Sequence, residues 1–350
     1  MHPWSYACVY VLVAIGVASL FTGGLSTFAL PLIVFGLVPL CELFTPGTTA
    51  NATPDQEQTR LADPRFNVLL LAAVPAVYGS VATLLWQAHT GALVGIELLG
   101  GVASIGLLVG ALGLNVGHEL GHRASKRMQM VSRVLYFPAL YVHFFVEHNR
   151  GHHMRVATEE DPASARRGDW LYAHWVRSIV HGVRSAWDLE ATRLRRTGHS
   201  PFSLRNEVLV GWVLQAVALG AVFAWSPVAA VTWVGAALVG VLLLETVNYV
   251  EHYGLRRSKN ARGRWERVRP IHSWNSNHSI GRVLLFDLSR HSDHHANPRR
   301  PFPVLRHFDD APQLPTGYPG MMVLSTVPPL FHLVMERELD RVSTPAPAAA

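Results

Sequence analysis

The sequence contains little cysteine and little charge. Its 350 residues include two cysteines, Cys8 and Cys41, and no C-x-x-C pair, which excludes a zinc ribbon or an iron–sulfur domain. Only 15% of the residues are charged, whereas 49% are hydrophobic and the mean hydropathy is +0.20. This balance disfavours a soluble globular class and favours a membrane protein.

Six apolar runs approach the roughly 20 residues that cross a bilayer. They lie at about residues 6–22, 25–43, 67–86, 92–115, 206–225 and 227–248. We predict an all-α integral membrane protein with six transmembrane helices, because a soluble core would have to bury six nearly uncharged helices. The first run lacks a basic flank and a cleavage site, so we expect it to be a retained helix. A seventh run, 134–146, is too short to cross and predicts an interfacial or re-entrant segment.

Lysine and arginine lie on one side of the predicted spans. Of the 30 basic residues, 28 fall within 123–205 and 256–341, and the turns on the opposite side have none. The positive-inside rule therefore predicts a multi-pass protein of a bacterial-type inner (plasma) membrane, with both termini in the cytoplasm. The pI of 9.6 follows from this topology and needs no nucleic-acid partner.

The polar stretches divide the chain into membrane and cytoplasmic parts. We expect a single domain at 1–341, with cytoplasmic regions at 116–205 and 249–341. The stretch 46–65 is rich in Pro, Thr, Asn and Asp and predicts a surface loop. The last residues, 342–350, are low in complexity and predict a disordered tail.

Histidine is concentrated in four segments of the cytoplasmic regions: HELGH (118–122), EHNRGHH (147–153), NYVEHYG (248–254) and RHSDHH (290–295). Histidines four residues apart share one face of a helix. The nine candidate metal ligands are His118, His122, His148, His152, His153, His252, His291, His294 and His295.

Nine neighbouring imidazoles favour metal binding. As cations they would repel one another, and as neutral rings they would leave many nitrogens unpaired. A single zinc ion takes four ligands, so nine suit two ions with four or five each. We therefore predict a di-metal site in a histidine-rich cytoplasmic cap, with no catalytic residue beyond the metal centre. Imidazole binds iron, zinc and copper, so the element stays open at this point.

Four carboxylates neighbour the candidate ligands: Glu119, Glu147, Glu251 and Asp293. We expect them to accept the second ring N–H of a ligand and so to fix its tautomer. Direct ligation, or a surface salt bridge with Arg123 or Arg150, is the alternative.

Two other features have competing interpretations. HELGH matches the H-E-x-x-H motif of zinc metalloproteases, with Glu119 as general base, but a protease has no use for the other three segments. His272 and His278 lack the paired spacing, and we expect them to be hydrogen-bonding or capping residues.

The same segments, extended to HELGHR, EHNRGHH, NYVEHYGL and RHSDHHANP, resemble the four motifs of the integral-membrane alkane 1-monooxygenases, within the membrane fatty acid desaturase/hydroxylase superfamily. HSWNSNH (272–278) and LRHFDDAPQLPTGYPGMM (305–322) add to the likeness, which runs from the third span to about residue 337. CELFTPG, at the end of the second span, departs from the family's more acidic turn and puts the first loop in doubt.

The resemblance implies a six-helix membrane fold and two iron ions, a non-haem di-iron centre, held by the nine histidines. It also implies that O2 hydroxylates the terminal methyl of medium- or long-chain n-alkanes to 1-alkanols. Rubredoxin supplies the electrons, with its reductase and NADH upstream, and must be a separate chain here because the cysteines for it are absent. A related oxygenase or desaturase acting on xylene methyl groups or fatty acyl lipids is the alternative. A metal carrier is disfavoured because the spans are nearly free of charge.

Overall fold

The computed structural model describes residues 1–343, and within that range it is built from helices without a strand. In chain order the helices are α1 (Pro3–Ala7), α2 (Val9–Thr22), η1 (Gly24–Phe28), α3 (Ala29–Leu32), η2 (Ile33–Leu37), α4 (Val38–Phe44), α5 (Pro54–Ala62), α6 (Arg65–His89), α7 (Gly95–Leu108), η3 (Val109–Leu114), α8 (Asn115–Gly121), α9 (Lys126–Tyr136), α10 (Phe144–Glu147), η4 (His148–His152), α11 (His153–Arg155), α12 (Leu171–Arg196), α13 (Glu207–Trp225), α14 (Pro227–His252), η5 (Pro270–His272), α15 (Ser279–Leu284), α16 (His291–Ala296), η6 (Phe302–Val304), α17 (Tyr318–Ser325) and α18 (Pro328–Ser343).

Among the described residues, six helical segments are long and apolar enough to cross a membrane, as the sequence predicts. They are Pro3–Thr22, Gly24–Phe44, Arg65–His89, Gly95–Gly121, Glu207–Trp225 and Pro227–His252. The fourth and sixth extend past the apolar runs, which end near 115 and 248. Their polar ends, with His118 on one and Glu251 on the other, are buried inside the protein, so each helix continues where the apolar pattern stops. The chain is therefore an all-α, multi-pass membrane protein.

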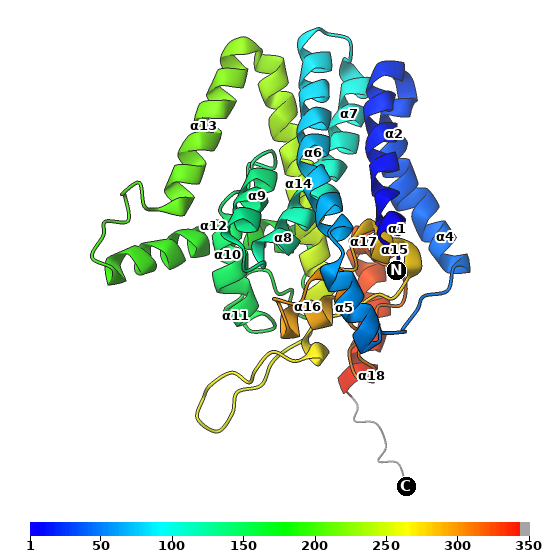
Figure 1. The fold of residues 1–350 in the computed structure, drawn as a ribbon, viewed down its shortest axis with the longest axis vertical. Coiled ribbons are helices and arrows are strands. Elements are labelled where there is room, and N and C mark those ends of the chain that lie inside the picture. Colours follow the sequence, from blue (N-terminus) through cyan, green and yellow to red (C-terminus); the bar gives the residue numbers. More distant parts are fainter. Residues whose placement is uncertain (344–350) are drawn as a thin grey trace.

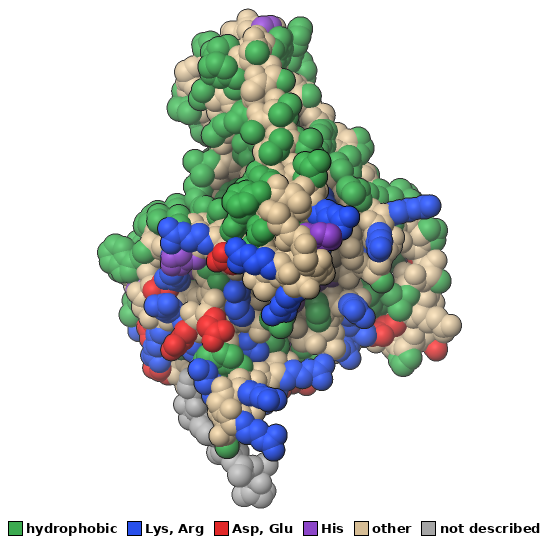
Figure 2. All heavy atoms as spheres, turned by 90° about the vertical axis from the view of Figure 1, so that its left-hand side faces the viewer, with side chains coloured by type: hydrophobic (Ala, Val, Ile, Leu, Met, Phe, Trp, Pro, Cys, Tyr) green, Lys and Arg blue, Asp and Glu red, His purple; other side chains and the backbone are tan. Residues whose placement is uncertain are grey.

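The spans stand together at one end of the molecule, and the shorter helices gather at the other (Figure 1). The N-terminus and α18, the last described helix, both lie toward the end with the shorter helices. Figure 2 shows apolar side chains over the upper half of the visible face and the charged side chains on the lower half. The histidine-bearing helices α8, α11 and α16 lie where the spans meet the shorter helices (Figure 1).

Capping residues explain where several helices begin. The Asn206 side chain accepts the backbone N–H groups of the first turn of α13, and Ser226 caps α14, whose first residue is Pro227. The expected loop at 46–65 contains a nine-residue helix, α5, which the sequence analysis missed. Its signals were present, because Thr53 and Gln56 form a capping box around Pro54.

The short apolar run at 134–146 is not among the six spans. It forms the end of α9, a turn, and the start of α10. Phe144, Phe145 and Val146 are buried in the main hydrophobic core. Packing of this segment against the core fixes the position of His148, which follows directly.

The C-terminal part ends in α18, which extends to Ser343 and so includes the first two residues of the tail expected at 342–350. Residues 344–350 lie outside the described residues. The single-domain boundary at 341 stays a prediction.

Candidate metal centre

The structure brings all nine candidate histidines together at the ends of the fourth and sixth spans that adjoin the shorter helices. His118 lies on α8 and His122 directly follows it, while His252 ends α14. The others come from η4, α11 and α16. Seven of the nine are buried, and His122 and His153 are partly buried. Four segments that are far apart in sequence therefore converge on one site.

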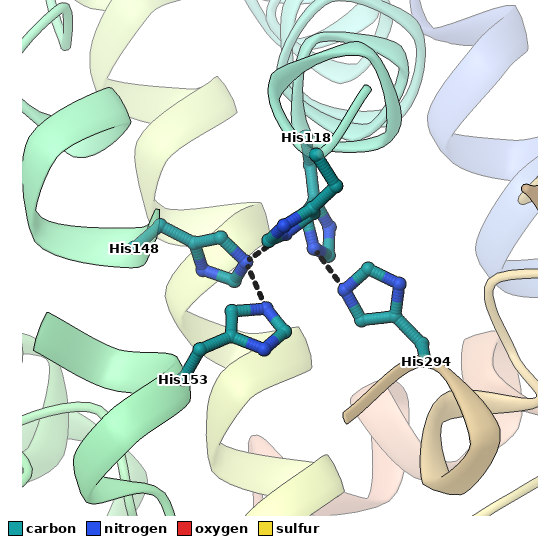
Figure 3. A group of neighbouring side chains, drawn as sticks. His118, His148, His153 and His294 are labelled. Carbon is teal, nitrogen blue, oxygen red and sulfur yellow. Dashed lines mark hydrogen bonds between the residues drawn. The ribbon is translucent and has the colours of Figure 1, made fainter. Parts of the chain in front are cut away.

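The first group contains five rings: His118, His122, His148, His153 and His294. One ligand nitrogen from each lies within 4.8 Å of all the others. The Nε2 atoms of His118 and His294 are 2.7 Å apart, and those of His148 and His153 are 2.9 Å apart. Figure 3 shows these four rings pointing toward one another from separate helices.

The second group contains His152, His252 and His295, whose ligand nitrogens again lie within 4.8 Å of one another. His252 is also grouped with His291 and Glu251. The Nε2 atoms of His152 and His295 are 3.3 Å apart, and His291 Nε2 lies 3.0 Å from Glu251 Oε2. Five of the nine histidines thus surround one point, and the other four form two overlapping sets that share His252.

The ring spacing fits metal coordination. Nitrogens bound to one ion at about 2.1 Å lie about 3.0 Å apart in adjacent positions and about 4.2 Å apart in opposite ones. The measured Nε2 separations of 2.7–3.3 Å lie near the adjacent value, and no two ligand nitrogens of a group are more than 4.8 Å apart. Hydrogen bonds alone do not account for them, because His148 Nε2 is near both His122 Nε2 (3.1 Å) and His153 Nε2 (2.9 Å) but carries at most one proton.

The electrostatics of the site also suit a metal. Burial lowers the pKa of His122 to about 3. Burial and the neighbouring imidazoles lower the pKa values of His148, His153, His294 and His295 well below the ordinary histidine value. These rings are therefore neutral near pH 7, and a neutral imidazole offers the lone pair that a metal ion takes.

A π-helical turn changes how the histidines pair. The sequence analysis placed His148 and His152 on one face of an α-helix. Residues 148–152 instead form η4, in which hydrogen bonds run from i to i+5. His148 therefore pairs with His153, while His152 joins the second group. The extra residue in the turn lets one short segment serve both groups.

Asp161 is a residue of the site that the sequence analysis missed. Its Oδ2 lies 2.9 Å from His152 Nδ1 and accepts a hydrogen bond from Ser164. Burial alone would lower the pKa of His152, but Asp161 outweighs it and raises that pKa. His152 therefore holds its proton on Nδ1 and directs Nε2 into the second group, as in carboxylate–histidine–metal arrangements.

Backbone conformation explains why Asp161 was missed. It ends an acidic run, EED, that is typical of a solvated loop. The chain turns back toward η4 at Ala157, which has φ of 57°, an unfavourable value for a residue with a side chain. The Ser164 hydroxyl accepts the Ala157 N–H and closes the turn. A single sequence carries no clear signal for this reversal.

Replacing Asp161 with Asn should lower metal affinity about 10- to 100-fold, the usual effect of losing a carboxylate behind a histidine ligand. Asn keeps the shape and one acceptor but removes the charge that fixes the His152 tautomer. Metal titration of purified protein measures the change. The matched control is Asp188→Asn, because Asp188 is an exposed carboxylate in the cleft that Asp161 also lines. Equal metal affinity in the Asp161 variant and the wild type would contradict this role.

The four carboxylates expected to contact ligands have different partners. Glu251 alone lies against one of the nine histidines. Glu119 pairs with Arg123 at 2.7 Å and accepts the Phe302 N–H, Glu147 pairs with Arg155, and Asp293 pairs with Arg306. Unlike a surface salt bridge, each of these three carboxylates is buried, and each ties a histidine-bearing segment to its neighbour. Glu119 thus faces an arginine at the place where a protease would need a free base.

His272 and His278 lie outside the two groups. His272 Nδ1 accepts the Arg269 N–H at 3.0 Å, and His278 stands at the N-terminal cap position of α15 with its Nδ1 3.0 Å from the Ser276 hydroxyl. Both contacts agree with the expected hydrogen-bonding or capping roles.

An apolar cavity of about 100 Å³ ends at the histidines. His118, His148 and His291 line one part, and residues of α2, α3, η2, α7, η3, α14, α15 and α17 line most of the rest. A second apolar pocket, on the side of the spans, shares four of its walls: Phe35, Leu107, Leu243 and Met322. Only side chains therefore separate a hydrophobic molecule in the bilayer from the histidine site.

A larger cleft of about 880 Å³ lies outside the spans, between α12 and residues 154–166. It contains the exposed arginines Arg166, Arg184 and Arg196. Asp161 also lines it, so the cleft reaches the partner of His152.

Comparison with known proteins agrees with this architecture. Residues 96–325 match the model of the fatty acid desaturase family. Alkane 1-monooxygenase 1 of Pseudomonas aeruginosa is 43% identical over 318 residues, covering 88% of this chain and 82% of that protein. Alkane 1-monooxygenase 1 of Alcanivorax borkumensis is 40% identical over 324 residues, covering 92% and 79%. The xylene/toluene monooxygenase hydroxylase component of Pseudomonas putida is 28% identical over 259 residues, covering 71% and 68%.

Proposed function

Because the chain belongs to the fatty acid desaturase family and, within it, to the alkane 1-monooxygenases, we propose that it hydroxylates the terminal methyl of medium- or long-chain n-alkanes with O2 and electrons from rubredoxin. The observation that carries this proposal is an apolar cavity that ends at nine clustered histidines. An alkane has no polar group to recognise, so its binding must come from apolar burial, worth about 0.8 kcal/mol per methylene.

The proposed cofactor is a pair of iron ions. The five-histidine group would hold one ion, and His152, His252, His291 and His295 would hold the other, with Glu251 beside His291. Iron bound there would supply the oxygen-activating redox chemistry. The protein's own residues orient the rings through Asp161, direct the chain end along the apolar walls, and keep water away from the reacting methyl.

A reconstituted assay tests the substrate. Iron-loaded protein in detergent is mixed with rubredoxin, its reductase, NADH, alkanes, fatty acyl lipids and xylenes, and the products are identified by mass spectrometry. We expect terminal alkanols. Products from acyl lipids alone would overturn the substrate assignment. Methyl-aromatic hydroxylation is a second candidate, favoured by the likeness to the xylene/toluene monooxygenase component, and benzylic alcohols in the same mixture would reveal it.

The cavity wall should set the accepted chain length. Ala111 lines the cavity in η3, seven residues or about two helical turns from His118. In Ala111→Phe the ring would occupy space that the distal part of a long alkane needs. Excluding three methylenes costs about 2.4 kcal/mol, or about 50-fold in kcat/KM for long chains, while short chains should be converted as before. Leu99→Phe, at a lipid-facing position of the same span, is the control. An unchanged product distribution would contradict this placement of the substrate.

We propose that rubredoxin binds at the arginine-containing cleft, because rubredoxins are acidic as a class and the cleft reaches Asp161. The double variant Arg184→Glu, Arg196→Glu should raise the KM for rubredoxin about 10-fold at low salt. The effect should be smaller at high salt, because exposed charges at the edge of an interface act mainly on the rate of association, and salt screens them. Arg299→Glu, an exposed arginine elsewhere, is the control. KM values that match the wild type at every salt concentration would exclude the cleft.

The proposed orientation places the histidines, the cleft and both termini in the cytoplasm of a bacterial-type inner membrane. It is supported by the 28 basic residues in the two large non-membrane regions. A cysteine introduced into the hairpin near residue 260 should react with an impermeant reagent only after the cells are opened.

A further inference from the structure

Glu245 is a carboxylate buried in the sixth span, where ionisable groups are costly and usually functional. Tyr141 donates a hydrogen bond to it at 3.1 Å, Ser178 at 2.5 Å and Asn248 at 3.2 Å. All three donors are neutral, so this carboxylate lacks the cation that a buried charge normally needs. Its surroundings therefore favour a group that holds a proton.

A small internal cavity of about 10 Å³ lies beside Glu245, close to the roughly 10–15 Å³ that one water molecule requires. Tyr141, His143, Glu147 and Ser178 are among its walls. Two buried atoms of that wall, Glu147 Oε2 and His143 Nε2, have no hydrogen-bond partner among the described residues. Unpaired buried polar atoms beside a space of this size indicate a bound water molecule.

The small cavity adjoins both larger spaces. Phe144 and Asn248 line it and the apolar cavity, and Pro162 lines it and the larger cleft beside α12. Glu245 therefore lies between the cleft and the histidine site, and each pair of neighbouring spaces shares one or two wall residues. The other titratable groups near it are Glu147, His143 and Tyr141 across the small cavity, His174 on α12, and His152 farther off. Glu147 pairs with Arg155, which leaves Glu245 as the carboxylate without a cation.

We propose that Glu245 carries protons from the cleft, through a water molecule in the small cavity, to the oxygen chemistry at the histidine site. The proposal rests on the proposed function, whose balance is alkane, O2, two electrons and two protons giving alkanol and water. One oxygen atom enters the C–H bond, and the other leaves as water with the two protons. Among the titratable groups of the apolar cavity's walls, the histidines are the proposed metal ligands, Glu251 lies against His291, and the Tyr318 hydroxyl donates to the Trp274 carbonyl.

Glu245→Gln tests the proposal, because the amide keeps the size of the side chain, and the Tyr141 and Ser178 hydroxyls can turn to accept its N–H. We expect unchanged metal content, a kcat lowered about 100-fold, and a larger solvent deuterium isotope effect, in line with the loss of a proton-transfer group. Glu245→Asp keeps a carboxyl group and should recover most of the rate. Glu42→Gln, a buried glutamate of the second span whose Oε1 accepts the Gly281 N–H, is the control and should behave as wild type.

Infrared spectroscopy supplies a measurement independent of turnover. A protonated carboxyl band should shift in D2O, disappear in Glu245→Gln and persist in Glu42→Gln. Wild-type kcat and isotope effect in Glu245→Gln would overturn the carrier role alone. If Glu245→Gln loses metal, the test depends on Glu245→Asp. A Glu245→Asp variant that regains both the metal and the full rate supports the carrier role. A Glu245→Asp variant that regains the metal but not the rate overturns it. A wild-type protein that makes no alkanol would overturn the proposed function and the need for a carrier together.

Discussion

Replacement of His152 with alanine is expected to abolish alkanol formation and to lower the metal content of the purified protein. His152 is buried, its Nδ1 is held by Asp161 at 2.9 Å, and its Nε2 lies 3.3 Å from His295 Nε2. Removing the ring takes one of the three imidazoles from the second group and leaves the Asp161 carboxylate buried without its histidine partner. The loss of metal affinity should therefore exceed the roughly 100-fold loss that is expected when only the hydrogen-bond partner of a ligand is changed.

Two measurements on the same sample check this expectation: elemental analysis of bound metal and mass spectrometry of the products. His278→Ala is the matched control, because this histidine lies outside both groups. It should retain metal and activity. Full activity in His152→Ala would contradict the assignment of the second group. Loss of metal in both variants would indicate a folding defect instead.

The convergence of the nine histidines could be predicted from sequence, because clusters of imidazole beside apolar spans have few roles besides metal binding. Their division between two groups could not. His294 and His295 are adjacent in sequence and on α16, yet they enter different groups. The division depends on which side of α16 faces α8 and which faces α14, and that orientation is set by tertiary packing.

The spans were predictable in number but less so in length. Hydropathy locates the part of a helix that contacts lipid, and it fails where polar residues turn inward. The sixth span continues through Glu245, Asn248 and Glu251 to His252, all buried against other parts of the protein. A hydropathy pattern ends the span near 248 and so separates it from the site that it supports. The four polar residues are costly in lipid but stable here because each has a partner or a role in the site.

Asp161 and Glu245 show a second limit of sequence reasoning. Each matters through a contact made across the fold, with His152 in one case and with Tyr141 and Ser178 in the other. Neither stands at a spacing that marks it. The carboxylates that do neighbour histidines in sequence, Glu119 and Glu147, instead pair with arginines. Proximity in sequence to a ligand is therefore a weak guide to which carboxylate orients it.

Loading the protein with zinc in place of iron is expected to restore its stability but not its activity. Both ions bind imidazole, so zinc should occupy the same histidines, and a ligand at 1,000 times its Kd stabilises the folded state by about 4.1 kcal/mol. Zinc has no accessible redox change, so it cannot exchange electrons with O2. The melting temperature should rise with either metal, whereas alkanols should form with iron alone.

This pair of measurements separates two roles of the histidines that a single activity assay combines. If metal only held α8, η4 and α16 together, zinc would support turnover as well as iron does, and the redox role would be wrong. Activity that rises until two iron ions are bound per chain would support a two-ion centre, while saturation at one ion would reduce the second group to a structural site. The electron supply is checked by measuring rubredoxin reduction and NADH consumption in the zinc-loaded sample. Rubredoxin and its reductase stay competent whichever metal the histidines hold.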